Sequence, residues 1–86
     1  MSEAREHRLK RLKIRSWRRG IKEMDLILGG WFDAMRGDLG DEDIALYEAL
    51  LSENDHDLYQ WVSGQADAPA RFAPLVANIA AHANSQ

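Results

Sequence analysis

The stretch Met24-Asp25-Leu26-Ile27-Leu28-Gly29-Gly30-Trp31-Phe32-Asp33-Ala34-Met35 decides the fold. Its large apolar residues recur at intervals of three and four, as they do along the buried face of an α-helix. No stretch of the chain alternates strictly between apolar and polar residues, and no hairpin dipeptide separates two strand-like runs. The sequence therefore predicts an all-α protein. The buried face of this helix is expected to hold Met24, Leu28, Trp31, Phe32 and Met35.

Two adjacent glycines interrupt this helix at Gly29 and Gly30. Each costs about 1 kcal/mol relative to alanine in a helix interior, so their presence needs a reason. Either another helix crosses closely at this point, or the helix bends. We favour close packing.

Two short helices are predicted downstream, after a chain-breaking loop over 36–40. Asp41 is a suitable N-cap for the first of them, and either Asn54 or Asp55 caps the second. Gly64 suits the C′ position that ends the second helix. The residues expected to be buried are Ile44, Tyr47, Leu50 and Leu51 in the first helix and Leu58, Trp61 and Val62 in the second.

The last helix follows a loop over 64–69 and is expected to run to about His82. Its start stays open, because Pro74 is tolerated only in a first turn and a start before Pro69 implies a kink. Residues 83–86 are expected to form a frayed tail. The whole chain, 1–86, is then one domain, a compact bundle of about five short helices. The inward residues of the last helix are Phe72, Leu75, Val76 and Ile79.

Upstream, the first helix is predicted over about 4–15, and Ser16 is expected to cap the helix that runs to Met35. This assignment places Arg18 and Arg19 in a first helical turn, where the helix dipole disfavours cations. The two arginines are therefore expected to serve something other than helix stability. The thin apolar edge of the first helix is Leu9, Leu12 and Ile14.

Charge is distributed unevenly along the 86 residues. Residues 1–22 carry +7, because nine Lys or Arg outnumber Glu3 and Glu6, whereas residues 23–86 carry −10. Such a basic head favours association with an acidic surface and makes that association sensitive to salt. The absence of cysteine excludes disulfides and thiolate metal sites. No membrane-spanning run and no signal peptide are found.

No constellation in the sequence has the spacing of a catalytic or metal site. His7, His56 and His82 lie in separate segments, and none has a second ligand three or four residues away. The acids of 38–43 lack calcium-loop spacing. The run Asp55-His56-Asp57 resembles an acid/base pair, but adjacent residues at a helix start do not converge on one substrate atom. We expect no enzymatic activity, no metal and no tightly bound cofactor.

The basic first helix leaves nucleic acid as an alternative partner, because its cations are suited to phosphates. The acidic remainder of the chain opposes this reading, and neither a helix-turn-helix reading element nor an aromatic stacking platform follows. The alternative function is therefore a small basic-headed helical module that binds nucleic acid or another acidic partner.

The segment 18–25 is predicted to be a partner-binding surface. Gly20 lets a foreign backbone approach because it has no Cβ, and the planar fork of Arg19 suits carboxylate, phosphate or carbonyl groups. Pairing of Arg19 with Glu23 explains the segment weakly, since the carboxylate-first order is the better one in helices. We expect Gly20→Arg or Glu23→Ala to leave the fold intact, because both positions are on the predicted surface.

Two sequence elements lie about thirty residues apart in this helical chain. The first consists of Arg11-Leu12, Ser16 and Arg18-Arg19-Gly20-x-x-Glu23-x-Asp25-Leu26-x-Leu28. The second is Asp57-Leu58-Tyr59-x-Trp61. Together they resemble the succinate dehydrogenase flavinylation factor family. The resemblance covers nearly the whole chain in order and size. It implies a five-helix assembly factor from a bacterial cytoplasm, with the mitochondrial matrix less favoured.

The resemblance further implies the partner and the cofactor. The partner is the flavoprotein subunit of succinate dehydrogenase, sometimes that of fumarate reductase, and the factor promotes covalent attachment of FAD to a histidine of that subunit. FAD then belongs to the partner, and neither nucleic acid nor membrane is bound. The partner-binding residues carried over to this chain are Arg19, Gly20 and Glu23 as the contact, Asp25 and Ser16 as supports, and Arg18, Arg11 and Asp57.

Overall fold

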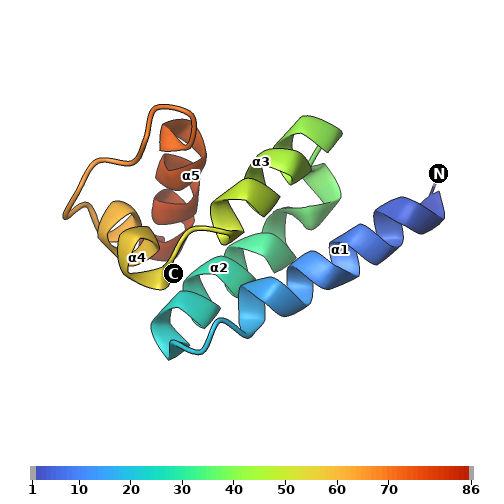
Figure 1. The fold of residues 1–86 in the computed structure, drawn as a ribbon, viewed down its shortest axis with the longest axis horizontal. Coiled ribbons are helices and arrows are strands. Elements are labelled where there is room, and N and C mark those ends of the chain that lie inside the picture. Colours follow the sequence, from blue (N-terminus) through green and yellow to red (C-terminus); the bar gives the residue numbers. More distant parts are fainter. Residues whose placement is uncertain (1, 86) are drawn as a thin grey trace.

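The computed structural model describes residues 2–85 of the chain, and side chains over 4–85. Within that range the chain is helical, with no strand, which confirms the predicted all-α class (Figure 1). A short 3₁₀ helix, η1, spans Arg36–Asp38. The α-helices are α1 (Ser2–Trp17), α2 (Lys22–Met35), α3 (Asp41–Leu51), α4 (Asp55–Ser63) and α5 (Ala73–Asn84).

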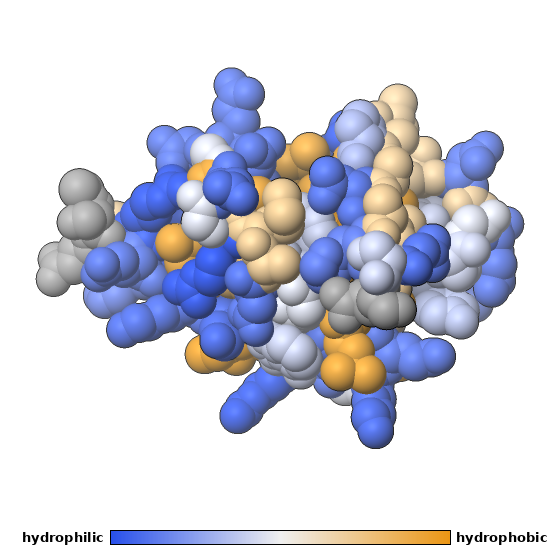
Figure 2. Space-filling model, turned by 180° about the vertical axis from the view of Figure 1, so that it is seen from behind, coloured by the Kyte–Doolittle hydropathy of each residue, from blue (hydrophilic) through white to orange (hydrophobic). Residues whose placement is uncertain are grey.

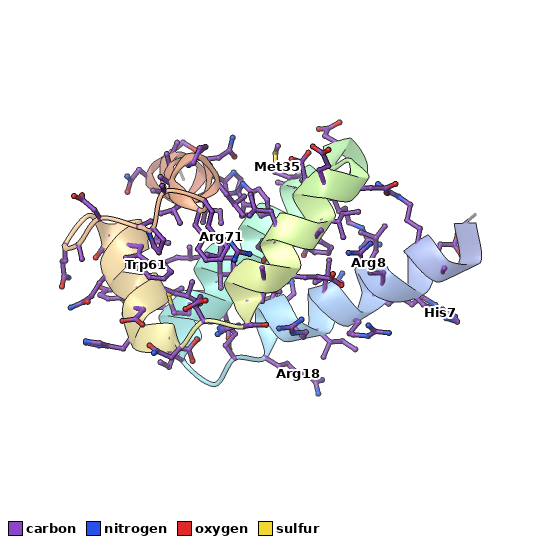
Figure 3. All side chains as sticks on the ribbon, turned by 45° about the horizontal axis from the view of Figure 1, so that its top comes forward. His7, Arg8, Arg18, Met35, Trp61 and Arg71 are labelled. Atoms are coloured by element: carbon purple, nitrogen blue, oxygen red, sulfur yellow. The ribbon has the colours of Figure 1, made fainter. Side chains whose placement is uncertain are left out.

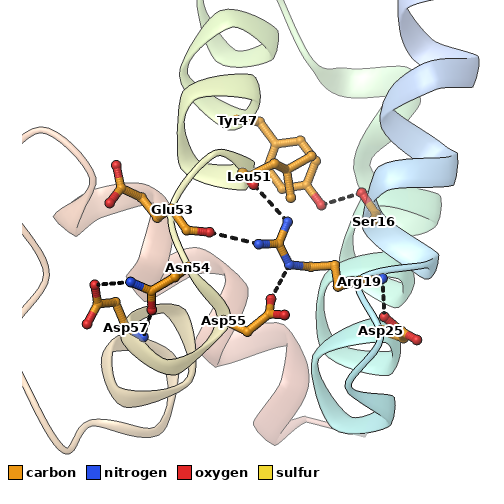
Figure 4. A network of polar contacts seen from close by, with 9 residues as sticks. All are labelled: Ser16, Arg19, Asp25, Tyr47, Leu51, Glu53, Asn54, Asp55 and Asp57. Carbon is orange, nitrogen blue, oxygen red and sulfur yellow. Dashed lines mark hydrogen bonds and ion pairs between the residues drawn. The ribbon is translucent and has the colours of Figure 1, made fainter.

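The first three helices run back and forth beside one another, and α4 and α5 lie together at one end of the bundle (Figure 1). α1 packs on α2 and α3, whereas α5 packs on α2 and α4. The turn between α1 and α2 and the connection between α3 and α4 come close together in this arrangement (Figure 4). That meeting point positions the candidate site.

The core is built around Tyr47 of α3, which is fully buried. Its ring stacks on Phe32 at a centroid distance of 5.6 Å and tilts against Trp31 at 4.9 Å. The predicted buried faces are confirmed, with Met35, Trp61 and Leu75 half-buried at their edges. The prediction for Ile14 is wrong, because 59% of its surface is exposed.

Ser16 is not the N-cap that the sequence predicts. α1 continues through Ser16 to Trp17, and α2 begins only at Lys22. Ser16 is fully buried, and its Oγ donates to the Leu12 carbonyl at 2.7 Å. Arg18 and Arg19 consequently lie in the turn between the helices and not in the first turn of α2.

Close packing at the glycine pair is confirmed for Gly29. A Cβ at Gly29 would lie 2.3 Å from the Trp17 ring, so only glycine admits this indole against α2. At Gly30 a Cβ would meet nothing within 4 Å. The crossing element is therefore α1, and its contact residue is Trp17.

The other helix ends agree with the sequence to within one or two residues. Gly40, one residue before the predicted Asp41, is the N-cap of α3. Asn54 caps α4 by accepting from the Asp57 N–H at 2.8 Å, and Gly64 ends α4 with a φ of 84°. α5 begins at Ala73, which places Pro74 in its first turn. It ends at Asn84, two residues past His82. Fraying of 83–86 stays a prediction, and Gln86 lies outside the described residues.

Candidate partner-binding site

The turn over 18–21 is shaped by Gly20, whose φ is +102°. L-residues rarely adopt this conformation because their Cβ meets the backbone, so glycine is needed here for the turn itself. Gly20 is also exposed, and a Cβ there would meet nothing within 4 Å. The open surface expected at Gly20 is confirmed. That Gly20→Arg leaves the fold intact stays a prediction, but any side chain is strained at this φ, so the substitution also costs stability.

Arg19 points into the protein and not toward solvent. Its guanidinium donates to the Leu51 carbonyl and to the Glu53 carbonyl, each at 2.8 Å, and its Nε donates to Asp55 Oδ1 (Figure 4). Only 11% of the Arg19 side chain is exposed. The planar fork of arginine is therefore used to bind the end of α3 and the start of α4 to the α1–α2 turn.

Asp25 and Ser16 support the turn from the two helices that it joins. Asp25 Oδ1 accepts from the backbone N–H of Arg19 at 2.7 Å. The Oγ of Ser16 lies 2.7 Å from the Tyr47 hydroxyl, which also lies 3.2 Å from the Leu28 carbonyl. Burial raises the pKa of Tyr47, so its hydroxyl stays protonated and able to donate.

The side chains left outward at this turn are those of Arg18 and Glu23, both exposed. Arg18 extends away from the bundle at the end of α1 (Figure 3). Glu23 forms no ion pair or hydrogen bond with any side chain over 4–85, and the weak pairing considered between Arg19 and Glu23 is absent from that range. The turn thus presents a cation, an open glycine and an unengaged carboxylate within six residues.

Arg11 and Asp57 lie outside this cluster. Arg11 is exposed on α1, two helical turns before the α1–α2 turn. Asp57 belongs to the cap of α4, because its backbone N–H and its carboxylate both bond to the Asn54 side chain (Figure 4). Sequence reasoning missed Asp55, the counterion of Arg19. The sequence suggested Asp55 as a capping residue or as a member of an acid/base pair, and nothing in the local pattern pairs it with a residue 36 positions earlier.

The basic head is partly neutralised within the fold. Arg5 pairs with Asp41 and Arg8 with Glu48, each at 2.6 Å, and Lys13 lies 3.7 Å from Asp33. The hydrogen bond from Arg8 lowers the pKa of the Glu48 carboxyl. The inward cations of α1 therefore hold α1 against α2 and α3, and the outward ones stay available.

Two findings bear on other kinds of site. Among residues 4–85, no three His, Asp or Glu side chains gather as a group that would hold a metal ion. No helix within the described part of the chain has the length and apolar character required to cross a membrane.

Comparisons with known proteins place this geometry in context. Residues 10–83 match the family described as the flavinator of succinate dehydrogenase. The chain is 37% identical over 71 residues to the FAD assembly factor SdhE of Photobacterium profundum, and the match covers 80% of each protein. It is 36% identical over 64 residues to succinate dehydrogenase assembly factor 2, mitochondrial, of Penicillium rubens.

The Penicillium match covers 74% of this chain and a fifth of that relative, and a match to the same-named protein of Mycosarcoma maydis covers 30% of it. The chain thus spans less than a third of these fungal relatives and most of the bacterial one. No solved structure was found to match. Because this family matches residues 10–83, which include the 18–25 segment and all of α2, α3 and α4, the chain belongs to the family of flavinators of succinate dehydrogenase.

Proposed function

We propose that this chain is an assembly factor that binds the flavoprotein subunit of succinate dehydrogenase and promotes covalent attachment of FAD to it. The relatives named above support the reaction and the partner, since they are named for FAD assembly and for succinate dehydrogenase assembly. The flavoprotein of fumarate reductase is a second substrate of the same kind. FAD is held by the partner, and the chain itself acts without a catalytic group.

The observation that carries the proposal is the exposed turn at Gly20 and Glu23, which is held rigidly from below by Arg19 and Asp25. Gly20 leaves room for the partner's backbone, and Glu23 accepts from a donor on the partner. Arg19 contributes by fixing the turn. This indirect role takes the place of the direct contact with the partner that the sequence predicts for its side chain. Since binding then orders little on this side of the interface, more of the contact energy goes into affinity.

The physical role is a shift in conformational population. Covalent flavinylation requires the reacting histidine nitrogen and the flavin carbon to be held in near-attack geometry. A helper that binds the reactive domain arrangement better than the others raises the population of that arrangement. No proton transfer by the helper is needed for this effect.

The test measures covalent FAD in the purified flavoprotein subunit, incubated with FAD and with or without this chain, as flavin fluorescence in a denaturing gel. Wild-type chain is expected to raise the fluorescence, and Glu23→Ala is expected to lower that gain. Glu42→Ala is the matched control, because Glu42 is also an exposed glutamate in a first helical turn. Equal flavinylation with and without the chain refutes the proposed function.

A further inference from the structure

The cations of the basic head separate into an inner and an outer set. Arg5, Arg8, Lys13 and Arg19 pair with carboxylates of α2, α3 and α4, and Arg15 lies 3.3 Å from the Ser52 hydroxyl. Among side chains over 4–85, the outer set forms no ion pair or hydrogen bond, and each member is exposed. These outer cations are Lys10, Arg11, Arg18 and Lys22.

Two of the outer cations share one face of α1 with an exposed apolar residue, and a third comes directly after the helix. Lys10 lies four residues and Arg11 three residues from Ile14, so these three lie on the same side of α1. Arg18 follows the last residue of α1, and its backbone N–H donates to the Ile14 carbonyl at 3.0 Å. Ile14 is 59% exposed, more than the other exposed large hydrophobic residues over 4–85, Leu26 and Ile21. The face of the molecule seen in Figure 2 is largely hydrophilic and carries separate apolar areas.

Beside Ile14 lies a shallow groove between α1 and α2, here called the α1 groove. Trp17 is held in place there, because its ring sits against Gly29 and its Nε1 donates to Asp33 Oδ2 at 3.1 Å. The Nζ of Lys13 lies 3.7 Å from Oδ1 of the same carboxylate. The residues that line the groove are Lys13, Ile14, Trp17, Arg18 and Asp33.

We propose that the α1 groove is a second contact with the flavoprotein subunit and receives an apolar side chain carried on an acidic segment. This inference rests on the proposed function and deepens it by naming the chemistry of the segment. Tryptophan and arginine are enriched at the energetic centres of protein interfaces, and an immobilised indole loses little entropy on binding. Arg18 borders both the groove and the Gly20 turn, so one partner surface covers both.

The segment is proposed to be acidic because the surface around the α1 groove carries exposed cations. The outer cations form no ion pair among side chains over 4–85, although the charge of Arg11 also acts on the Glu48 carboxyl. Carboxylates on a partner are therefore attracted to this surface. Nucleic acid fits less well, because an isoleucine and the Asp33 carboxylate interrupt the cations and residues 23–86 carry −10. A partner protein with an apolar residue flanked by acids matches both parts of the surface.

The test measures the dissociation constant of the purified chain with the FAD-free flavoprotein subunit, at low and high salt. Ile14→Ala is expected to weaken binding about fivefold to tenfold, since truncation removes the apolar contact. Leu26→Ala is the matched control, because Leu26 is 55% exposed and lies on the α5 side of α2, outside the groove. It is expected to change binding less than about twofold, as for a residue outside an energetic centre.

A charge-reversal pair tests the acidic partner separately. Arg18→Glu is expected to weaken binding at least about tenfold, mostly by slowing association, and to reduce its dependence on salt. Arg71→Glu is the matched control, because it changes the net charge by the same amount as Arg18→Glu and Arg71 is an exposed arginine outside the groove (Figure 3). It is expected to have little effect on the dissociation constant. Circular dichroism of each variant checks that the helices are intact.

The outcomes separate this inference from the proposed function. If the chain does not bind the flavoprotein at all, both are overturned. If wild-type chain binds and Glu23→Ala weakens binding but Ile14→Ala and Arg18→Glu do not, only the second contact is overturned. Equal losses for Ile14→Ala and Leu26→Ala also overturn it, as does tighter binding of the chain to a DNA duplex than to the flavoprotein.

Discussion

The guanidinium of Arg19, in the turn between α1 and α2, is paired with the carboxylate of Asp55, in the first turn of α4. Both side chains are largely buried, with 11% and 21% of their surfaces exposed. The same guanidinium also binds two carbonyls at the end of α3 and just beyond it. One residue thus ties the proposed partner-binding turn to the second half of the chain.

Replacing Arg19 with alanine is expected to lower the free energy of unfolding by about 2–4 kcal/mol, since it leaves Asp55 and two carbonyls without their donor. Arg19→Lys keeps the charge but loses the planar fork, so an intermediate loss is expected. Urea unfolding followed by circular dichroism measures both. A variant Arg19→Ala that unfolds like wild type but no longer supports flavinylation contradicts the internal role and favours a direct contact.

Gly20→Ala is expected to lower the free energy of unfolding by about 1–2 kcal/mol, because alanine is strained at a φ of +102°. Gly37→Ala is the control, since Gly37 has no positive φ and a Cβ there would meet nothing within 4 Å. Thermal unfolding of the two variants separates backbone strain from any loss of partner binding. Equal stability of the two variants would falsify the strain argument.

The two glycines of α2 are expected to respond in opposite directions. Gly29→Ala pushes a methyl group into the Trp17 ring, so a loss of about 1–3 kcal/mol is expected from overpacking. Gly30→Ala meets no neighbour and gains helix propensity, so a gain of about 0.5–1 kcal/mol is expected. Urea unfolding measures the difference. A stabilising Gly29→Ala shows that the indole moves away freely.

The periodicity of the sequence is sufficient to predict the helices and most of the core, because a helix that buries one face has apolar residues at intervals of three and four. Met24, Leu28, Trp31 and Phe32 are examples, all confirmed as buried. Helix caps whose hydrogen-bond partners are close in sequence can be predicted equally well. Asn54 reaches a backbone N–H only three residues away.

Residues whose partners are distant in sequence are where prediction fails. A serine can be an N-cap, or it can lie inside a helix with its hydroxyl bonded to the carbonyl four residues earlier. Which of the two positions Ser16 takes depends on its contact with Tyr47, 31 positions later. The inward orientation of Arg19 likewise depends on Asp55 and on two carbonyls, one at the end of α3 and one just beyond it. Local patterns carry no information about such pairs. The sequence could therefore single out the 18–25 segment as a predicted partner-binding surface, but it could not predict the internal contacts of Arg19.

The ion pair between Arg8 and Glu48 makes stability depend on pH in the acid range. The hydrogen bond from Arg8 lowers the pKa of Glu48 in the folded state. A carboxyl with a lowered folded-state pKa contributes stability that is fully present above its ordinary pKa. That contribution is lost as pH falls through the lowered value, because the unfolded state then binds more protons. Glu48→Gln is therefore expected to be less stable than wild type at pH 7.

Urea unfolding of wild type and Glu48→Gln at a series of pH values between 7 and about 3 measures this contribution. The difference in unfolding free energy is expected to shrink toward zero at the acid end, as wild-type Glu48 becomes protonated. Glu42→Gln serves as the control, since Glu42 is exposed and forms no side-chain ion pair within residues 4–85. If the difference in unfolding free energy between Glu48→Gln and wild type stays constant over the whole pH series, the effect comes from packing of α1 on α3 and not from the charge of Glu48.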